Sequence, residues 1–126
     1  GRVIESEFDE AVEFVLGLSE PPLKSILHEG FVEWGFQVQT LAGVLEGQID
    51  LWGKVDGRIY LIDYKSGSER FKEKAFEQLS LYAWALRQFK HTEPIELVVI
   101  YPLIQKVQSR NFSDDLFAKW QSRLNG

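Results

Sequence analysis

The dipeptide Asp56-Gly57 constrains this chain more than any other feature, because it separates two strand-like apolar runs, 44–55 and 58–65. Asp-Gly is a preferred pair for a two-residue type I′ turn, in which both central residues need positive φ. Since the turn sets the register of its strands, the sequence predicts an antiparallel hairpin in which Val55 faces Arg58.

The predicted register brings acidic residues together. Asp50 and Asp63 face each other, with their Cβ atoms roughly 4.5–5.5 Å apart on one side of the sheet. Lys65 projects from the same side, because side chains of a strand alternate with a period of two residues. On the other side we expect an apolar layer in which Ile49 faces Tyr64 and Leu51 faces Ile62.

This arrangement of charges indicates a cation. Like charges directly opposite each other destabilise a hairpin, so we expect a positive charge between Asp50 and Asp63. Mg²⁺ or Mn²⁺ binds oxygen ligands, which aspartates, water and a substrate phosphate supply. Such a metal can activate water and stabilise charge on a phosphodiester, and Lys65 could orient the water or neutralise the developing charge. The alternative is that both aspartates lie on a solvated face.

The remaining patterns predict a mixed α/β domain. Helical spacing of apolar residues, a proline stop and an N-cap serine mark the helices, while aromatic and β-branched runs mark the strands. We expect helices at 8–18, 23–28, 71–89 and 113–124, the last capped by Ser113, and strands at 31–39, 44–55, 58–65, 95–101 and 106–112. The apolar run 95–101 is typical of a buried strand, and 106–112 of an outer one.

Composition narrows the class of protein. The chain has 126 residues, 44% of them hydrophobic and 26% charged, as expected for one globular domain. It contains no cysteine, which excludes disulfides and thiolate metal sites within it. A formal charge of −5 argues against a stand-alone module that binds nucleic acid by bulk electrostatics. Without a membrane span or a signal peptide we expect a cytoplasmic protein, and the initial Gly and the lack of Met suggest an excised piece.

Three blocks of the sequence resemble one nuclease family. They are Gly47-x-x-Asp50, Asp63-Tyr64-Lys65-Ser66-Gly67 and Gln78-Leu79-x-Leu81-Tyr82, in that order. Together they resemble the RecB-type branch of the PD-(D/E)XK nuclease superfamily, and most closely the carboxyl-terminal nuclease domain of AddA-type helicase–nucleases, relatives of UvrD and Rep. The likeness covers residues 31–101. It implies a restriction-endonuclease-like α/β fold, a central mixed sheet flanked by helices, and metal-dependent cleavage of DNA.

The resemblance also implies roles for individual residues. The implied metal ligands are Asp50, Asp63 and the backbone carbonyl of Tyr64, the metal is Mg²⁺ or Mn²⁺, and the catalytic lysine is Lys65. Gln78 and Tyr82 match the glutamine–tyrosine pair of the family, and their i, i+4 spacing places them on one helix face. There they would touch DNA or brace the lysine. The alternative is a polar residue and an aromatic residue that pack where helix meets sheet.

Other residues leave two interpretations open. Glu33 looks like a family glutamate that borders the site, or is an exposed strand residue. Many family members carry a metal-binding histidine in an upstream Gly-x-x-x-His block, which is lacking here, and we expect His28 to end a helix instead. The four tryptophans are expected in the core, although Trp52 shares the Asp50 side of its strand.

A basic group follows the catalytic block. Arg70, Lys72 and Lys74 form the only compact basic group beside the predicted site. They would contact a phosphate backbone, or they are the solvated start of a helix. The chain has no glycine-rich phosphate loop, so we do not expect the domain itself to bind ATP.

The function implied is that of a metal-dependent deoxyribonuclease in DNA double-strand-break repair and recombination. We expect residues 1–126 to be a single nuclease domain, a carboxyl-terminal fragment of a longer helicase–nuclease. It would cut single-stranded DNA ends exonucleolytically. Its protein partners would be the ATP-binding helicase domains of the same polypeptide and a second subunit. The alternative is a catalytically incomplete nuclease-fold domain that serves as a DNA-end or protein-interaction module. A third hypothesis is a self-standing site-specific endonuclease, which would need a dimer surface and base-reading loops.

Overall fold

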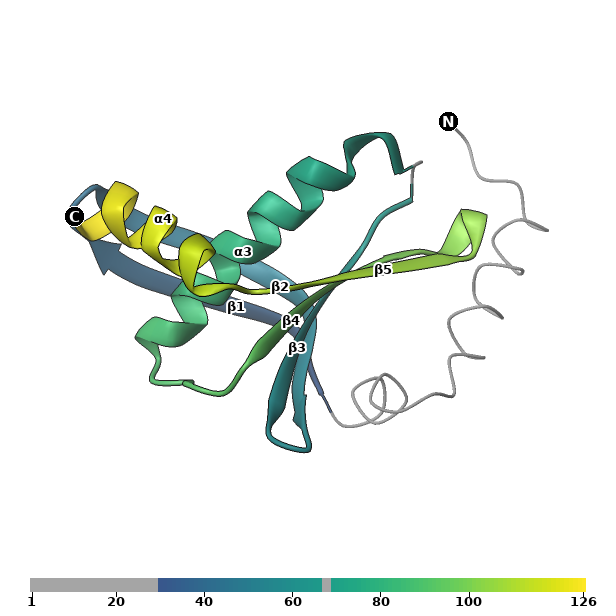
Figure 1. Ribbon diagram of the computed structural model, residues 1–126, viewed down its shortest axis with the longest axis horizontal. Coiled ribbons are helices and arrows are strands. Elements are labelled where there is room, and N and C mark those ends of the chain that lie inside the picture. Colours follow the sequence, from purple (N-terminus) through teal and green to yellow (C-terminus); the bar gives the residue numbers. More distant parts are fainter. Residues whose placement is uncertain (1–29, 67–68) are drawn as a thin grey trace.

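The computed structural model describes residues 30–66 and 69–126, which form a mixed five-stranded sheet with helices α3 and α4 over one face (Figure 1). The strands are β1 (Phe31–Thr40), β2 (Gly43–Val55), β3 (Arg58–Tyr64), β4 (Ile95–Tyr101) and β5 (Lys106–Asn111), and they lie in chain order across the sheet. Only β3 and β4 pair in parallel, because α3 (Lys72–Gln88) connects them; α4 (Asp114–Asn125) follows β5.

The predicted elements are confirmed from residue 30 onward. The strand predicted at 95–101 is β4, and the outer strand predicted at 106–112 is β5, which forms one edge of the sheet. The helix predicted at 71–89 is α3, preceded by one turn of 3₁₀ helix, Glu69–Phe71. A second such turn, Pro102–Ile104, follows β4. The predicted helices 8–18 and 23–28, and His28, lie outside the described residues.

Local signals are also confirmed. Ser113 caps α4, since its hydroxyl accepts a hydrogen bond from the backbone N–H of Leu116 at 3.2 Å. Asp56 and Gly57 have φ values of 51° and 76°, the positive pair that a type I′ turn requires. The hairpin register then runs as predicted, from Val55 opposite Arg58 inward along β2 and β3.

The main apolar core lies between the sheet and the two helices. Its fully buried members include Trp84 of α3, and Ile59 and Leu61 of β3. Trp52 is buried in the same cluster and stacks on Phe31, with ring centroids 4.8 Å apart, so its interpretation as a core residue is confirmed. A smaller cluster on the opposite face consists of Leu51, Ile62, Val98 and Ile100. Within the described residues, no helix combines the length and apolar character that crossing a bilayer requires.

One prediction about the hairpin is wrong. Ile49 was expected in the same layer as Leu51, but it belongs to the main core, whereas Leu51 packs in the smaller cluster. β1 pairs with β2 at Trp34–Ile49 and at Val32–Leu51, and Glu33 lies between these pairs with a φ of 50°. This positive φ interrupts the pleat of β1 beside Ile49, and Ile49 packs toward the helices instead of sharing a layer with Leu51.

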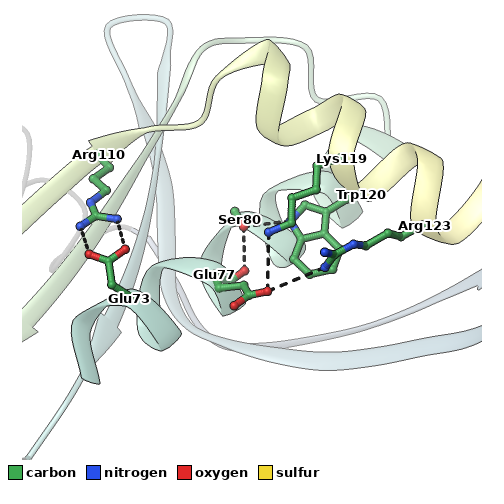
Figure 2. Close-up of polar contacts among 7 residues, drawn as sticks. All are labelled: Glu73, Glu77, Ser80, Arg110, Lys119, Trp120 and Arg123. Atoms are coloured by element: carbon green, nitrogen blue, oxygen red, sulfur yellow. Dashed lines mark hydrogen bonds and ion pairs between the residues drawn. The ribbon is translucent and has the colours of Figure 1, made fainter. Parts of the chain in front are cut away.

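Polar contacts hold α3 against β5 and α4 (Figure 2). Glu73 forms a two-pronged ion pair with Arg110 of β5, and Glu77 lies near Lys119 and Arg123 of α4. These side chains are largely exposed, and such pairs contribute little each. A buried contact matters more: Trp120 donates to the Ser80 hydroxyl at 2.9 Å, and Ser80 donates to the Glu77 carbonyl at 2.7 Å.

Candidate active site

The site forms where β2 parts from β3. Regular pairing of the two strands ends at Leu51 and Ile62. Beyond that point the Asp50 carboxylate accepts a hydrogen bond from the backbone N–H of Tyr64 at 3.0 Å. The predicted facing pair of aspartates is thus replaced by a side-chain bridge, because a backbone N–H that leaves the ladder needs another partner. The bridge fixes Asp50 beside the end of β3.

Asp63 is the most perturbed carboxyl group described. Its side chain is only 15% exposed. The pKa of Asp63 is raised from the ordinary 3.8 to about 6, chiefly by burial and then by the adjacent Asp50 side chain, against the lowering effect of Lys65. The carboxylates of Asp50 and Asp63 therefore lie within mutual reach, as the sequence predicted.

Lys65 lies beside these carboxylates. Its Nζ is 3.0 Å from Asp63 Oδ2, and its backbone N–H donates to the carbonyl of Ile100, which extends the parallel ladder past β3. Asp63 Oδ2 is buried and makes no well-oriented hydrogen bond. Two adjacent carboxylates thus have one ammonium beside them, paired with Asp63, which leaves a net negative charge at the site. This donor set fits a hard divalent cation.

Gln78 and Tyr82 contact each other on α3. Gln78 Nε2 donates to the Tyr82 hydroxyl at 3.0 Å, as their spacing predicted. The Tyr82 ring packs edge-on against Phe36 with centroids 5.1 Å apart, so the aromatic body is part of the core while its hydroxyl faces Gln78. Gly47 is needed beneath this ring, because a Cβ there would lie 2.7 Å from Tyr82 and from Phe36.

A cavity connects the lysine to α3. About 370 Å³ in volume, it is lined by Lys65, Ser66, Phe71, Lys74, Ala75, Gln78 and Tyr101. Lys65 and Gln78 therefore share one cavity, as expected if both meet the same substrate. Lys74 lines it as well, so one member of the basic group reaches the site. We call this the β3–α3 cavity.

Other predicted residues lie less close. Glu33 is exposed, and its backbone carbonyl accepts a hydrogen bond from Gln48 Nε2 at 3.3 Å; in β1 it lies between the pairs Val32–Leu51 and Trp34–Ile49. The Tyr64 ring packs against the smaller cluster, and the Tyr64 backbone N–H makes the bridge to Asp50. Among residues 30–66 and 69–126, no group of three or more His, Cys, Asp and Glu side chains is placed to hold a metal.

Sequence reasoning missed the cavity residues Phe71 and Tyr101. Phe71 was assigned to the apolar stripe of the helix, yet its side chain is 60% exposed, with the Arg70 guanidinium 5.4 Å and the Lys74 ammonium 5.9 Å from its ring centroid. An aromatic residue between basic neighbours was the available signal. Tyr101 is 1% exposed, and its hydroxyl has no hydrogen-bond partner within residues 30–66 and 69–126. The signal for Tyr101 in the sequence was its hydroxyl group, at the end of the mostly apolar run 95–101.

Comparison with known proteins agrees with this geometry. The family model described as PD-(D/E)XK nuclease superfamily matches residues 6–126. That span includes both aspartates, the lysine and the glutamine–tyrosine pair. The mixed sheet with its helices is consistent with the restriction-endonuclease-like arrangement that the sequence predicted. No curated protein matches the chain.

Proposed function

The chain belongs to the PD-(D/E)XK nuclease superfamily, and from this we propose that it is a Mg²⁺- or Mn²⁺-dependent deoxyribonuclease. The observation that carries the proposal is the convergence of Asp50, Asp63 and Lys65 at the end of β3. Two adjacent carboxylates beside one ammonium repel each other. A divalent cation bound between them, together with a phosphodiester, would offset this repulsion.

In this proposal Asp50, Asp63 and the backbone carbonyl of Tyr64 hold the cation. A bound divalent cation supplies Lewis acidity toward a phosphodiester and lowers the pKa of nearby water. The hydrogen bond from the Tyr64 N–H to Asp50 fixes the orientation of that carboxylate before any ligand arrives. Preorganised ligands need little rearrangement on binding, which favours both affinity and rate.

Lys65 provides positive charge on the substrate side of the site. Lys65, whose Nζ is 3.0 Å from Asp63 Oδ2, also lines the β3–α3 cavity, so it can meet a phosphate there. Gln78 lines the same cavity and is oriented by its hydrogen bond to Tyr82. We assign this pair to positioning of the lysine and the DNA backbone.

We also propose a biological setting that is more specific than the family assignment. The three sequence blocks favour the nuclease domain of an AddA-type helicase–nuclease, cutting single-stranded DNA ends exonucleolytically during cytoplasmic double-strand-break repair and recombination. The formal charge of −5 supports a division of labour, because an acidic domain gains little DNA affinity from bulk electrostatics. Helicase domains, and a second subunit, would deliver the strand.

A second candidate is a catalytically incomplete domain that binds DNA ends or proteins. One observation favours it: the described residues offer two carboxylates and no third metal-ligating side chain at the site. His91, the histidine within those residues, lies against the Trp52 ring at 5.2 Å between centroids, away from the aspartates.

Calorimetric titration of Mg²⁺ and Mn²⁺ into the full chain, with cleavage of labelled single-stranded DNA followed in the same samples, tests the proposal. The test variant is Asp63→Ala. Its matched control is Asp56→Asn, which removes an exposed carboxylate in the turn. Metal binding and cleavage that both disappear in Asp63→Ala and persist in Asp56→Asn are the expected result.

Other outcomes separate the two candidates. Metal binding without cleavage favours the incomplete domain. Absence of binding at millimolar metal concentration refutes a metal centre in this chain. Cleavage that survives Asp63→Ala places the chemistry elsewhere and refutes the assignment of the site.

A further inference from the structure

The β3–α3 cavity differs in charge from the rest of the protein. The chain carries a formal charge of −5, yet the charged residues that line this cavity are two lysines, Lys65 and Lys74, without a carboxylate. Ser66 and Gln78 add neutral hydrogen-bonding groups. Its volume of about 370 Å³ is in the range of small-ligand pockets, roughly 300–1,000 Å³. The chemistry is that of a site for an anion rich in oxygen acceptors, such as a phosphate.

Tyr101 provides a second, independent sign of a ligand. Its side chain is 1% exposed, it lines the cavity, and its buried hydroxyl has no hydrogen-bond partner among the described residues. Buried hydroxyl groups are rarely left unpaired, because desolvation without a compensating hydrogen bond costs free energy. Burial raises the pKa of Tyr101, and Glu69 and Asp63 raise it further against the lowering effect of Lys65, so the hydroxyl lies in the electrostatic range of the carboxylate site. A phosphate oxygen in the cavity would accept a hydrogen bond from this hydroxyl.

Phe71 provides an aromatic surface at the cavity. The ring lines the cavity and is 60% exposed, although it sits at the N-cap position of α3, where a polar residue is usual. The Arg70 and Lys74 cations lie 5.4 Å and 5.9 Å from its centroid. An exposed ring flanked by cations suits stacking on a nucleobase whose phosphates the cations meet.

The geometry points to a single-nucleotide subsite in the β3–α3 cavity, in which Phe71 stacks on an unpaired base and Tyr101, Lys74 and Ser66 hold its phosphate. This rests on the proposed function, since it makes single-stranded DNA the ligand and the nucleotide beside the cut the one recognised. A base within a duplex has both faces covered by its neighbours, so Phe71 selects single strands.

A neighbouring cavity is a poorer path for the strand. It has a volume of about 420 Å³ and shares Lys74 and Gln78 with the β3–α3 cavity. Its other charged lining residues are Glu46 and Glu77, which repel phosphates. The DNA backbone is therefore expected to follow the β3–α3 cavity.

Fluorescence anisotropy of labelled oligothymidylate with the full chain in EDTA tests the subsite without cleavage. Phe71→Ala should weaken binding on the order of tenfold, and Phe71→Tyr should restore it. Against an oligomer of the same length built of abasic residues, wild type and Phe71→Ala should bind alike, because no base remains to stack. Phe89→Ala is the matched control, an aromatic residue 43% exposed at the other end of α3.

The contributions of the Tyr101 hydroxyl and of Lys74 to DNA binding can be measured separately. Tyr101→Phe removes one oxygen and should weaken both oligomers equally. Lys74→Gln should reduce the slope of log affinity against log salt by about 0.7. Circular dichroism checks that each variant is folded.

The outcomes distinguish this inference from the proposed function. Equal binding of oligothymidylate by wild type and Phe71→Ala, or an equal loss for both oligomers, overturns the stacking subsite even if wild type cleaves DNA in Mn²⁺. Base-dependent loss in Phe71→Ala supports the subsite, also where wild type fails to cleave and the proposed nuclease function is refuted. Absence of oligomer binding by wild type overturns the subsite in this chain.

Discussion

Replacing Asp63 by asparagine should stabilise the metal-free protein above pH 6, although it breaks an ion pair. The carboxyl group of Asp63 has a pKa of about 6 in the folded protein and 3.8 ordinarily, mainly because it is buried and secondarily because of Asp50. Folding therefore favours the protonated form. That difference in pKa corresponds to roughly 3 kcal/mol, and its side chain, 15% exposed, is little screened by solvent.

The sign of the effect follows from proton binding. Between pH 3.8 and about 6 the folded state holds a proton that the unfolded state has lost, so the free energy of unfolding falls as pH rises. The contribution of the protonated group is complete below 3.8 and is lost above about 6. Asparagine resembles the protonated acid at every pH. The variant should therefore gain roughly 3 kcal/mol at pH 8, on the order of 10 °C in Tm, and almost nothing at pH 4.

Urea unfolding followed by tryptophan fluorescence in EDTA, at pH 4 and pH 8, measures this effect. Asp56→Asn is the control, because it removes an exposed carboxylate and keeps a residue that suits the type I′ turn. It should change stability little at either pH. If Asp63→Asn destabilises the protein at pH 8, Lys65 compensates the buried charge fully and the reasoning is refuted.

Three further substitutions test the fold and the chemistry. Gly47→Ala should cost about 1–3 kcal/mol in urea unfolding, because its Cβ would lie 2.7 Å from two aromatic rings; Gly35→Ala, whose nearest contact is 3.9 Å, should cost little, and equal costs would contradict the packing argument. Ser80→Ala should cost about 1–3 kcal/mol by the same measurement, since it leaves the buried N–H of Trp120 unpaired; an unchanged midpoint would show that this bond contributes nothing. Lys65→Ala should lower single-turnover cleavage in Mn²⁺ about 10²–10³-fold with the fold intact, and near-normal cleavage would remove the lysine from the mechanism.

Most of the fold could be predicted because its signals are local. The positive φ of Asp56 and Gly57, the cap at Ser113 and the apolar run of β4 each follow from short stretches of sequence. Because strand side chains alternate with a period of two residues, the register could be extended from the turn toward Asp50. It failed at Ile49, because the backbone at Glu33 departs from the pleat and tertiary packing drew Ile49 toward the helices.

Roles at the cavity were harder to predict than the residues of the catalytic block. Gln78 and Tyr82 were identified, and their mutual hydrogen bond follows from helix geometry. Phe71 was counted among the apolar residues of the helix predicted at 71–89, and Tyr101 was not singled out. Both misses have one cause: a hydrophobic pattern tells which residues tend to be buried, but not which of them border a cavity.

The sequence by itself determined that two carboxylates and a lysine would meet at one end of a hairpin. Turn chemistry and strand alternation act over a few residues, so no distant contact was needed. The tertiary structure alone decided the electrostatics. How far Asp63 is buried, and that the Tyr101 hydroxyl has no hydrogen-bond partner among the described residues, depends on how the sheet and α3 pack around them. Desolvation is a property of the assembled surroundings, and no short stretch of sequence contains it.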